Sequence, residues 1–217
     1  ITFTSNAGTI TSGIVDASSR NTANGNNVNI KASDSVSAIN VTTAAFLSGG
    51  SGNAGSVTIS SNTGTIDIGL IDARSNRING NGGAVTLNSA KGITVATDIL
   101  TYADTATGNT GNAGPINLTT TNGNISANNV FSSTLTGSGN AGNAGKITAT
   151  ATQRDITLGN VHSGAYVLGT GTAGDGGNIA LKAGDHITVS GRVDSTTFGT
   201  VSQGTPGSID LSANRLS

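Results

Sequence analysis

A histidine, a serine and an aspartate that could form a hydrolase triad occur on neighbouring turns of a repeat described below. His162 and Ser163 are adjacent, and Asp194 aligns one turn above His162. Consecutive residues of a strand point to opposite faces, so the Ser163 hydroxyl would face the interior while His162 faces solvent. A base and a nucleophile on opposite faces cannot share the hydrogen bond that activates serine. We therefore expect no catalytic triad, and a surface ion pair between His162 and Asp194.

A second polar group joins Arg154 and Asp155 to Asp185 and His186 of the next turn. The alignment places Arg154 beneath Asp185, and Asp155 beneath His186. Exposed ion pairs each contribute about 0 to 1 kcal/mol, so we interpret these residues as a solvated charged ladder. A weak metal site is the alternative interpretation. We predict no metal, no cofactor and no catalytic residue in this chain.

Paired carboxylates, which polysaccharide hydrolases use, have little support in the sequence. Asp16 and Asp72 share a position in the repeat but lie two turns apart, roughly 9.6 Å at the spacing of hydrogen-bonded strands. Acid–base catalysis by two carboxylates needs them clustered on one face of neighbouring turns. We therefore predict that the chain is not an enzyme, and a polysaccharide-active β-helix enzyme is kept as an alternative.

All these residues belong to a repeat that fills the chain. A Val/Ile-x-Ile/Leu motif follows a tetrapeptide rich in Gly and Asn and recurs every 27 to 32 residues. Eight such starts predict seven full turns and one further strand. The starts are Ile1, Val28, Val57, Val85, Ile116, Ile147, Ile179 and Ile209.

Each repeat contains three short segments in which apolar residues lie two apart, as half-buried strands require. We predict an all-β fold, a parallel β-helix (β-solenoid) with three short strands per turn, a triangular cross-section and about seven to eight turns. Residues 1–217 would form a single domain, which we expect to be a segment of a longer rod or a protomer that stacks. The second segments start at Ile10, Val36, Ile66, Ile93, Ile125, Ile156 and Ile187, and the third at Val15, Val41, Ile71, Ile99, Val130, Val161 and Val193.

Composition excludes several other classes of protein. The chain has 33 Gly, only 2 Pro, no Cys, Met or Trp, and a net charge of −1. Abundant Gly, Asn, Ser and Thr disfavour long helices, and the absence of a three-residue glycine period excludes collagen. Without a basic excess we predict no nucleic-acid partner, and without a long apolar stretch no transmembrane segment.

The tetrapeptide before each first segment predicts a tight corner. Gly and Asn tolerate positive φ angles at low cost, so we expect them there for conformational reasons. Stacked asparagines can also hydrogen-bond along the axis, each donating to one neighbour and accepting from the next. We predict a structural ladder at the second position of the tetrapeptide, made of Asn24, Asn53, Asn81, Asn112, Asn143 and Asp175.

Apolar residues also recur between the third segment and the corner. The simplest interpretation is an extra internal stack beneath the third corner of each turn. The alternative is a ridge that promotes lateral assembly. The residues are Phe46, Leu47, Ile78, Tyr102, Leu135, Tyr166, Val167, Leu168, Phe198 and Val201.

The repeated Gly-Asn-Ala-Gly-x-Ile/Val-x-Ile/Leu, followed by Gly-x-Ile and Ile/Val-x-Ala/Ser, resembles the repeats of filamentous-haemagglutinin-like exoproteins of the two-partner secretion type. It is most similar to the Gly/Asn/Thr-rich cyanobacterial versions. The resemblance covers essentially the whole chain and carries no catalytic motif. It implies a right-handed β-helix that is secreted and acts outside the cell in surface display, adhesion or matrix.

We therefore expect a non-enzymatic structural or adhesive protein of the bacterial cell surface or extracellular matrix, forming a rigid rod or filament. Repeat proteins of this kind bind through extended surfaces rather than enclosed sites. We expect self-association end to end or laterally, with surface glycans or other matrix components as further partners. An ice-binding β-helix is a second alternative, because polar, Thr-rich outward columns such as Thr2, Asn29 and Thr58 could order water.

Overall fold

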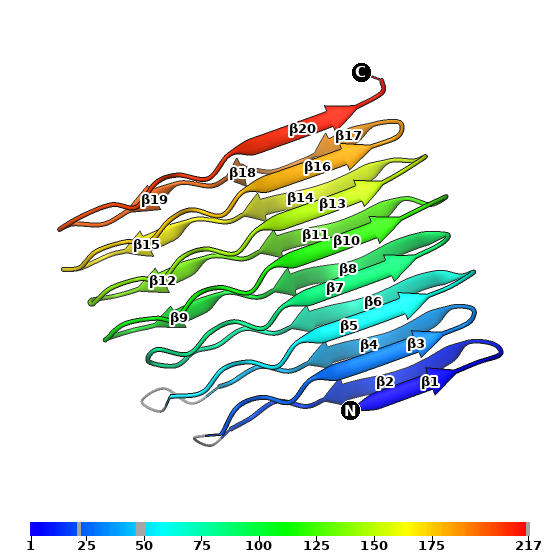
Figure 1. The fold of residues 1–217 in the computed structure, drawn as a ribbon, viewed down its shortest axis with the longest axis horizontal. Coiled ribbons are helices and arrows are strands. Elements are labelled where there is room, and N and C mark those ends of the chain that lie inside the picture. Colours follow the sequence, from blue (N-terminus) through cyan, green and yellow to red (C-terminus); the bar gives the residue numbers. More distant parts are fainter. Residues whose placement is uncertain (21–22, 47–50, 216–217) are drawn as a thin grey trace.

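The computed structural model describes residues 1–20, 23–46 and 51–215 and shows an all-β solenoid of about seven turns (Figure 1). In Figure 1 the nearer strands run left to right and the more distant strands run right to left, while the chain climbs from its N- to its C-terminus. That path is a right-handed coil. In the described residues, no helix is long and apolar enough to span a membrane.

The first sheet forms one long side of the solenoid. Its eight strands pair in parallel, each with its equivalents one turn below and above. The predicted first segments are these strands, which are β1 (Thr2–Ser5), β3 (Val28–Ala32), β5 (Val57–Ser61), β7 (Val85–Ser89), β10 (Ile116–Thr120), β13 (Ile147–Ala151), β16 (Ile179–Ala183) and β20 (Ile209–Ala213).

The second sheet forms the opposite side and joins the predicted second and third segments. In six turns these two segments lie in one strand that bends, and only the last full turn divides them into two. Bulges where the register shifts, as between Ala127 and Asn129, allow the bend. The strands are β2 (Ile10–Asp16), β4 (Val36–Thr42), β6 (Thr65–Asp72), β8 (Gly92–Leu100), β11 (Ile125–Phe131), β14 (Ile156–His162), β17 (Ile187–Val189) and β18 (Val193–Asp194).

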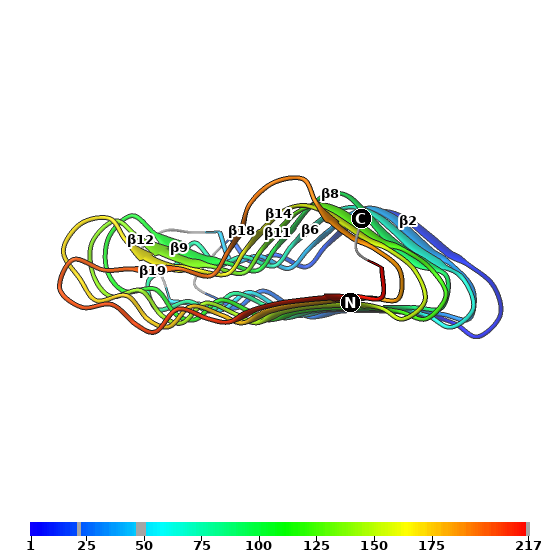
Figure 2. The same cartoon turned by 90° about the horizontal axis from the view of Figure 1, so that it is seen from above.

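A third, smaller sheet lies where the sequence predicted only a variable connection. Four short strands pair there in parallel. In the fourth to seventh turns this sheet continues the side formed by the second sheet, and the cross-section of the solenoid is flat and elongated rather than triangular (Figure 2). The strands are β9 (Ala103–Thr105), β12 (Thr134–Thr136), β15 (Ala165–Val167) and β19 (Thr197–Phe198).

Aliphatic ladders fill the space between the first and second sheets. Ile59 pairs with Ile30 below and Leu87 above, and all three are at most 2% exposed. Thr58, one residue earlier, is exposed. The alternation therefore agrees with the predicted register, in which the first and third residues of the motif face the core.

The predicted internal apolar stack beneath the third corner is wrong for most of its members. Val167 is fully buried, but Leu135, Leu168, Phe198 and Val201 are 40 to 69% exposed. Small residues and one fully buried arginine, Arg77, occupy the inward positions instead. Leu47 lies outside the described residues.

The corner glycines have a different role from the one predicted. In the described part of the chain, positive φ angles occur only at Gly8, Asn79, Gly92, Gly108 and Gly139, and none of these belongs to a corner tetrapeptide. The last glycine of the tetrapeptide is needed for space, because a Cβ at its position would overlap a carbonyl oxygen of the turn below. The corner therefore selects Gly for close stacking of turns rather than for a left-handed backbone.

Candidate functional site

Most of the aromatic residues lie on one outer face. This face, called the aromatic face below, consists of the outward residues at the end of the second sheet and along the third sheet. It holds five of the six Phe and Tyr residues of the chain. Strand pairing sets their columns, since Phe131 pairs with His162, and Tyr166 with Phe198. Its members in the fourth to seventh turns are Leu100, Tyr102, Asp104, Phe131, Ser133, Leu135, His162, Gly164, Tyr166, Asp194, Thr196 and Phe198, and Phe46, Asp72 and Arg74 precede them.

Arg74 organises the first part of this face. Its Nε lies 3.1 Å from Asp72 Oδ2, and its Nη1 donates to the Tyr102 hydroxyl at 2.5 Å. The guanidinium also lies over two rings, 5.5 Å from the centroid of Phe46 and 5.6 Å from that of Tyr102. Burial raises the pKa of Asp72, and the charge of Arg74 opposes this shift. Arg74 is thus held by two aromatic rings of the neighbouring turns and by a carboxylate of its own turn.

Tyr166 joins His162 and Asp194 into a compact polar cluster. Nε2 of His162 lies 2.9 Å from both the Tyr166 hydroxyl and Asp194 Oδ2, and the Tyr166 hydroxyl donates to that oxygen at 2.8 Å. The His162 and Tyr166 rings stack with centroids 5.3 Å apart. A Cβ at Gly164 would overlap the Tyr166 hydroxyl, so glycine makes this ring position possible.

The cluster shifts two pKa values in opposite directions. Burial is the main cause that raises the pKa of Tyr166 to about 12. Burial alone would raise the pKa of Asp194 as well, but hydrogen bonds from Tyr166 and Thr196 hold it below its ordinary value. The arrangement therefore favours a neutral phenol that donates to an ionised carboxylate.

A hollow of about 270 Å³ lies on the aromatic face between the Arg74 and Tyr166 clusters. Ser133 lies in the same column as Arg74, one turn above Tyr102, and its side chain is short. Burial raises the pKa of Asp104, which also faces the hollow. The lining residues are Tyr102, Asp104, Phe131, Ser133, Leu135, His162 and Tyr166.

Ser163 faces the interior, as its position in the strand predicted. Ser163 is fully buried and donates its hydroxyl to the Gly145 carbonyl at 2.5 Å. His162 and Asp194 do pair across adjacent strands, as the alignment indicated. Sequence reasoning missed Tyr166 as their third member. The signal that could have found it is Gly164, a gap between two residues on the same face.

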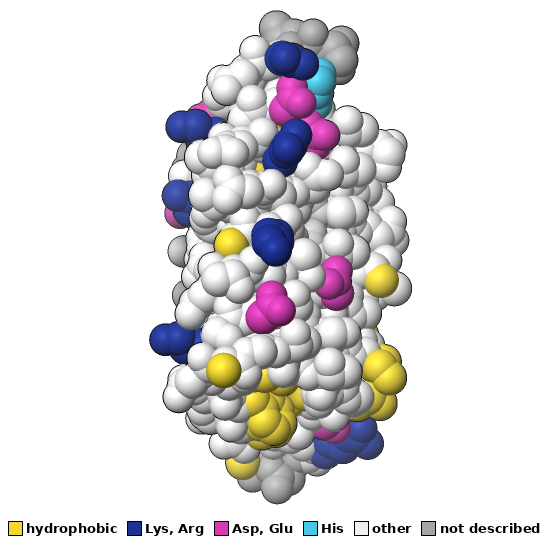
Figure 3. Space-filling model, turned by 90° about the vertical axis from the view of Figure 1, so that its right-hand side faces the viewer, with side chains coloured by type: hydrophobic (Ala, Val, Ile, Leu, Met, Phe, Trp, Pro, Cys, Tyr) yellow, Lys and Arg dark blue, Asp and Glu magenta, His cyan; other side chains and the backbone are white. Residues whose placement is uncertain are grey.

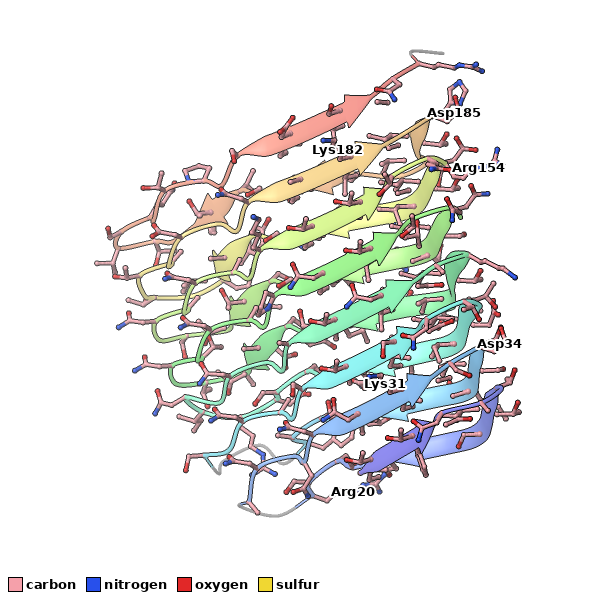
Figure 4. All side chains as sticks on the ribbon, turned by 45° about the vertical axis from the view of Figure 1, so that its right-hand side comes forward. Arg20, Lys31, Asp34, Arg154, Lys182 and Asp185 are labelled. Carbon is pink, nitrogen blue, oxygen red and sulfur yellow. The ribbon has the colours of Figure 1, made fainter. Side chains whose placement is uncertain are left out.

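The predicted charged ladder lies on the opposite edge, where the first and second sheets meet (Figure 3). His186 Nδ1 lies 3.5 Å from Asp155 Oδ1 and 3.2 Å from Asp185 Oδ1. Arg215 Nε approaches Asp185 Oδ1 at 3.4 Å, and the Arg154 carbonyl accepts from the Asp185 amide. Arg154 and Asp185 both project from this edge in Figure 4.

Asp155, Asp185 and His186 offer three ligand atoms that lie within 4.8 Å of one another. All three residues are partly exposed, and exposed acidic groups of this kind are common without an ion. Arg215 already brings a positive charge to Asp185. We derive no metal chemistry from this group.

The two carboxylates of the shared column remain apart. Asp16 pairs with Thr42, and Thr42 pairs with Asp72 on the next turn. Asp72 is bound to Arg74, and Asp16 has its pKa lowered chiefly by hydrogen bonds from Ser18. They therefore form no pair of catalytic carboxylates.

The corner asparagines form a ladder with a different bonding pattern from the expected one. Each side-chain Oδ1 accepts a hydrogen bond from a backbone N–H of the next turn, at 2.7 to 2.9 Å. One amide-to-amide bond also occurs, from Asn81 to Asn53. Asp175 can take an asparagine position because only an acceptor is needed, and its Oδ1 binds the Thr205 amide at 2.8 Å. The acceptors in order are Asn24, Asn53, Asn81, Asn112, Asn143 and Asp175.

The same bond recurs at other bends, which sequence reasoning missed. Asn side chains there also cap the amide of the turn above, at 2.8 to 3.2 Å. This explains much of the asparagine content as structural. The residues are Asn27, Asn109, Asn124, Asn140, Asn160 and Asn178.

Comparison with protein-family models, curated proteins and solved structures finds no match to this chain.

Proposed function

We propose that this chain is a non-enzymatic structural or adhesive protein of the bacterial cell surface or extracellular matrix, part of a rigid rod or filament. The observation that supports this most is the continuity of the ladders. Parallel pairing runs through all eight strands of the first sheet without a break. Such turn-by-turn bonding stiffens a solenoid and presents an extended outer surface.

The aromatic face supports an adhesive role. Elsewhere, outward positions of the first sheet carry small polar residues such as Thr58, Thr86 and Asn117. On the aromatic face, rings and aliphatic side chains reach solvent instead, with Leu135 40% and Phe198 47% exposed. Clustered exposed apolar side chains with polar neighbours are typical of contact surfaces. Surface glycans or other matrix components are the partners we propose for it.

The cell-surface location and the filamentous-haemagglutinin-like origin rest on the repeat pattern in the sequence. Self-association, end to end or laterally, is also part of this proposal. The exposed leucine and phenylalanine of the aromatic face favour the lateral mode.

The test is to incubate the purified protein with insoluble matrix polysaccharides and proteins and to measure retention and turnover together. We expect retention without new reducing ends or unsaturated products. New products would overturn the non-enzymatic proposal. If none of the matrices retained the protein, the adhesive proposal would be overturned.

A second candidate is a polysaccharide-active enzyme, favoured by the cluster of His162, Tyr166 and Asp194. A phenol in contact with an imidazole and a carboxylate can take part in proton transfer. However, Tyr166 has a pKa of about 12, far above the value near neutrality that suits a general base or acid. The product assay above decides between the two.

A further inference from the structure

The aromatic face holds a cation, Arg74, among its rings and has a hollow two turns above it. In the third turn Arg74 lies between the rings of Phe46 and Tyr102 and beside the Asp72 carboxylate. Cations placed over aromatic rings are attracted by the electric quadrupole of the ring, more strongly when they are partly desolvated. This part of the face therefore shows what the combination of rings and carboxylate binds.

Two turns above Arg74 the same column holds Ser133, and the next turn holds Gly164. The backbone bonds that define the column run from Ala45 to the Arg74 carbonyl, from Ser75 to Tyr102, and onward in the same way to Ser133 and Gly164. The Ser133 side chain is too short to fill the space that an arginine fills below, whereas the Tyr166 hydroxyl lies over Gly164. The hollow of about 270 Å³ lies at this place.

The walls of the hollow repeat the chemistry around Arg74. Phe131, Tyr102 and Tyr166 supply rings, and Asp104 supplies a carboxylate. Asp104 takes part in none of the ion pairs found in the described part of the chain, whereas Asp72 and Asp194 are both paired with arginine. The hollow thus combines aromatic walls with a carboxylate whose Oδ1 is buried and makes no hydrogen bond.

We infer that this hollow binds a basic side chain, a guanidinium or an ammonium group, presented by a protein partner. The cation lies against the rings of Tyr102 and Phe131 and pairs with Asp104. Charge complementarity favours this occupant over a neutral sugar, because a cation can pair with the unpartnered Oδ1 of Asp104 and lie against the rings at the same time. The inference goes beyond the scaffold role, because it assigns a ligand chemistry to one place on the face.

The experiment is an NMR titration of the intact chain with two matched peptides. The first is acetyl-Gly-Arg-Gly-amide, and the second has citrulline, a neutral isostere, in place of arginine. We expect saturable amide shifts around residues 102–104, 131–135 and 164–166 with the arginine peptide. The citrulline peptide should bind at least about tenfold more weakly, a loss of about 1.4 kcal/mol.

Two variants locate the site. Asp104→Asn removes the charge of the side chain and should weaken the binding of the arginine peptide about tenfold. Ser133→Arg places a guanidinium in the hollow from within the chain and should abolish binding. Thr119→Arg, at an exposed outward position of the first sheet, is the matched control and should bind as wild type does.

Several outcomes overturn the inference. Equal affinity for the two peptides, or unchanged affinity in Asp104→Asn, excludes recognition of the charge. Shifts with cellohexaose but not with the arginine peptide would assign the hollow to a saccharide. No shift with any probe would exclude a site, while retention on matrix in the assay above would leave the adhesive proposal standing. If Ser133→Arg does not fold, the affinity of Asp104→Asn for the arginine peptide still tests the inference.

Discussion

The Oδ1 atom of Asn112 accepts a hydrogen bond from the backbone amide of Asn143, one turn above, at 2.9 Å. The side chain thus replaces a carbonyl oxygen where the corner breaks the sheet ladder. The same bond joins Asn143 to Asp175. An aspartate serves as well as an asparagine in this ladder because the donating side-chain NH2 is not required.

Substitutions at Asn112 should follow this acceptor role. Asn112→Asp should leave the melting temperature nearly unchanged, whereas Asn112→Ala and Asn112→Gly should each cost about 0.5 to 1.5 kcal/mol. The cost is modest because the corner is exposed and water can bind the freed amide. Asn24→Ala should cost about the same, since Asn24 makes the same bond to Asn53. A full loss in Asn112→Asp would instead favour an amide-to-amide ladder.

The register of the core predicts a sharp contrast between adjacent residues. Ile59→Asp places a carboxylate among buried aliphatic side chains and should cost about 3 kcal/mol or more. Thr58→Asp, at the neighbouring exposed position, should cost less than about 0.5 kcal/mol. Thermal or urea unfolding of both variants measures this. Similar losses in the two would show that the alternation is assigned to the wrong residues.

The two tyrosines should titrate abnormally. Burial raises the pKa of both, that of Tyr166 to about 12. With no Trp in the chain, absorbance of the tyrosinate reports them directly. In the unfolded protein both should ionise near pH 10. Because the pKa of each tyrosine is higher in the folded state, the neutral phenols contribute to the free energy of unfolding. This contribution is complete below about pH 10 and is lost as the pH rises toward 12.

Tyr166→Phe isolates Tyr102 in that titration. The more alkaline step should disappear in this variant. A native-state midpoint near 10 for Tyr166 would contradict its buried position in the cluster with His162 and Asp194.

Asp104 and Asp194 should respond to pH with opposite signs. Burial raises the pKa of Asp104, so its ionised form destabilises the folded state above that pKa. Asp104→Asn should therefore raise the melting temperature at pH 7, and the gain should shrink as the pH falls toward 4. Melts of both proteins across this range test it.

Asp194→Asn is the control for that series. The pKa of Asp194 is held low, so its contribution is stabilising at pH 7 and is lost only as the pH falls below about 3.9 through the lowered value. This variant should be less stable than wild type at pH 7. The same sign of change in both variants would be inconsistent with the two environments.

Periodicity carried the prediction of the fold. Apolar residues two apart and glycine-rich corners at regular intervals placed the first sheet and both halves of the second, because side-chain burial in a sheet follows the sequence directly. The third sheet was not predicted. Its inward positions hold small or polar residues such as Ala103, Thr134 and Ala165, so it lacks the aliphatic alternation that marks the other strands.

The candidate site was harder to predict. Pairing of His162 with Asp194 follows from alignment alone, but the place of Tyr166 depends on how the chain bends after His162. Likewise, the hollow at Ser133 exists because a short side chain lies among the large side chains of neighbouring turns. Arg77 is fully buried, although arginine is almost always exposed in proteins. Such features depend on contacts between turns that no single repeat contains.

We propose that the solenoid is a scaffold and that the aromatic face makes its contacts. The most direct test is the amount of labelled protein retained by extracellular matrix, with wild type compared against a Phe131→Ser, Leu135→Ser double variant. A Thr58→Ser, Thr119→Ser double variant on the opposite face is the control, and all three are first shown to melt alike. We expect the Phe131→Ser, Leu135→Ser variant to lose about tenfold in affinity and the control to lose none. Equal retention of the two variants would contradict it.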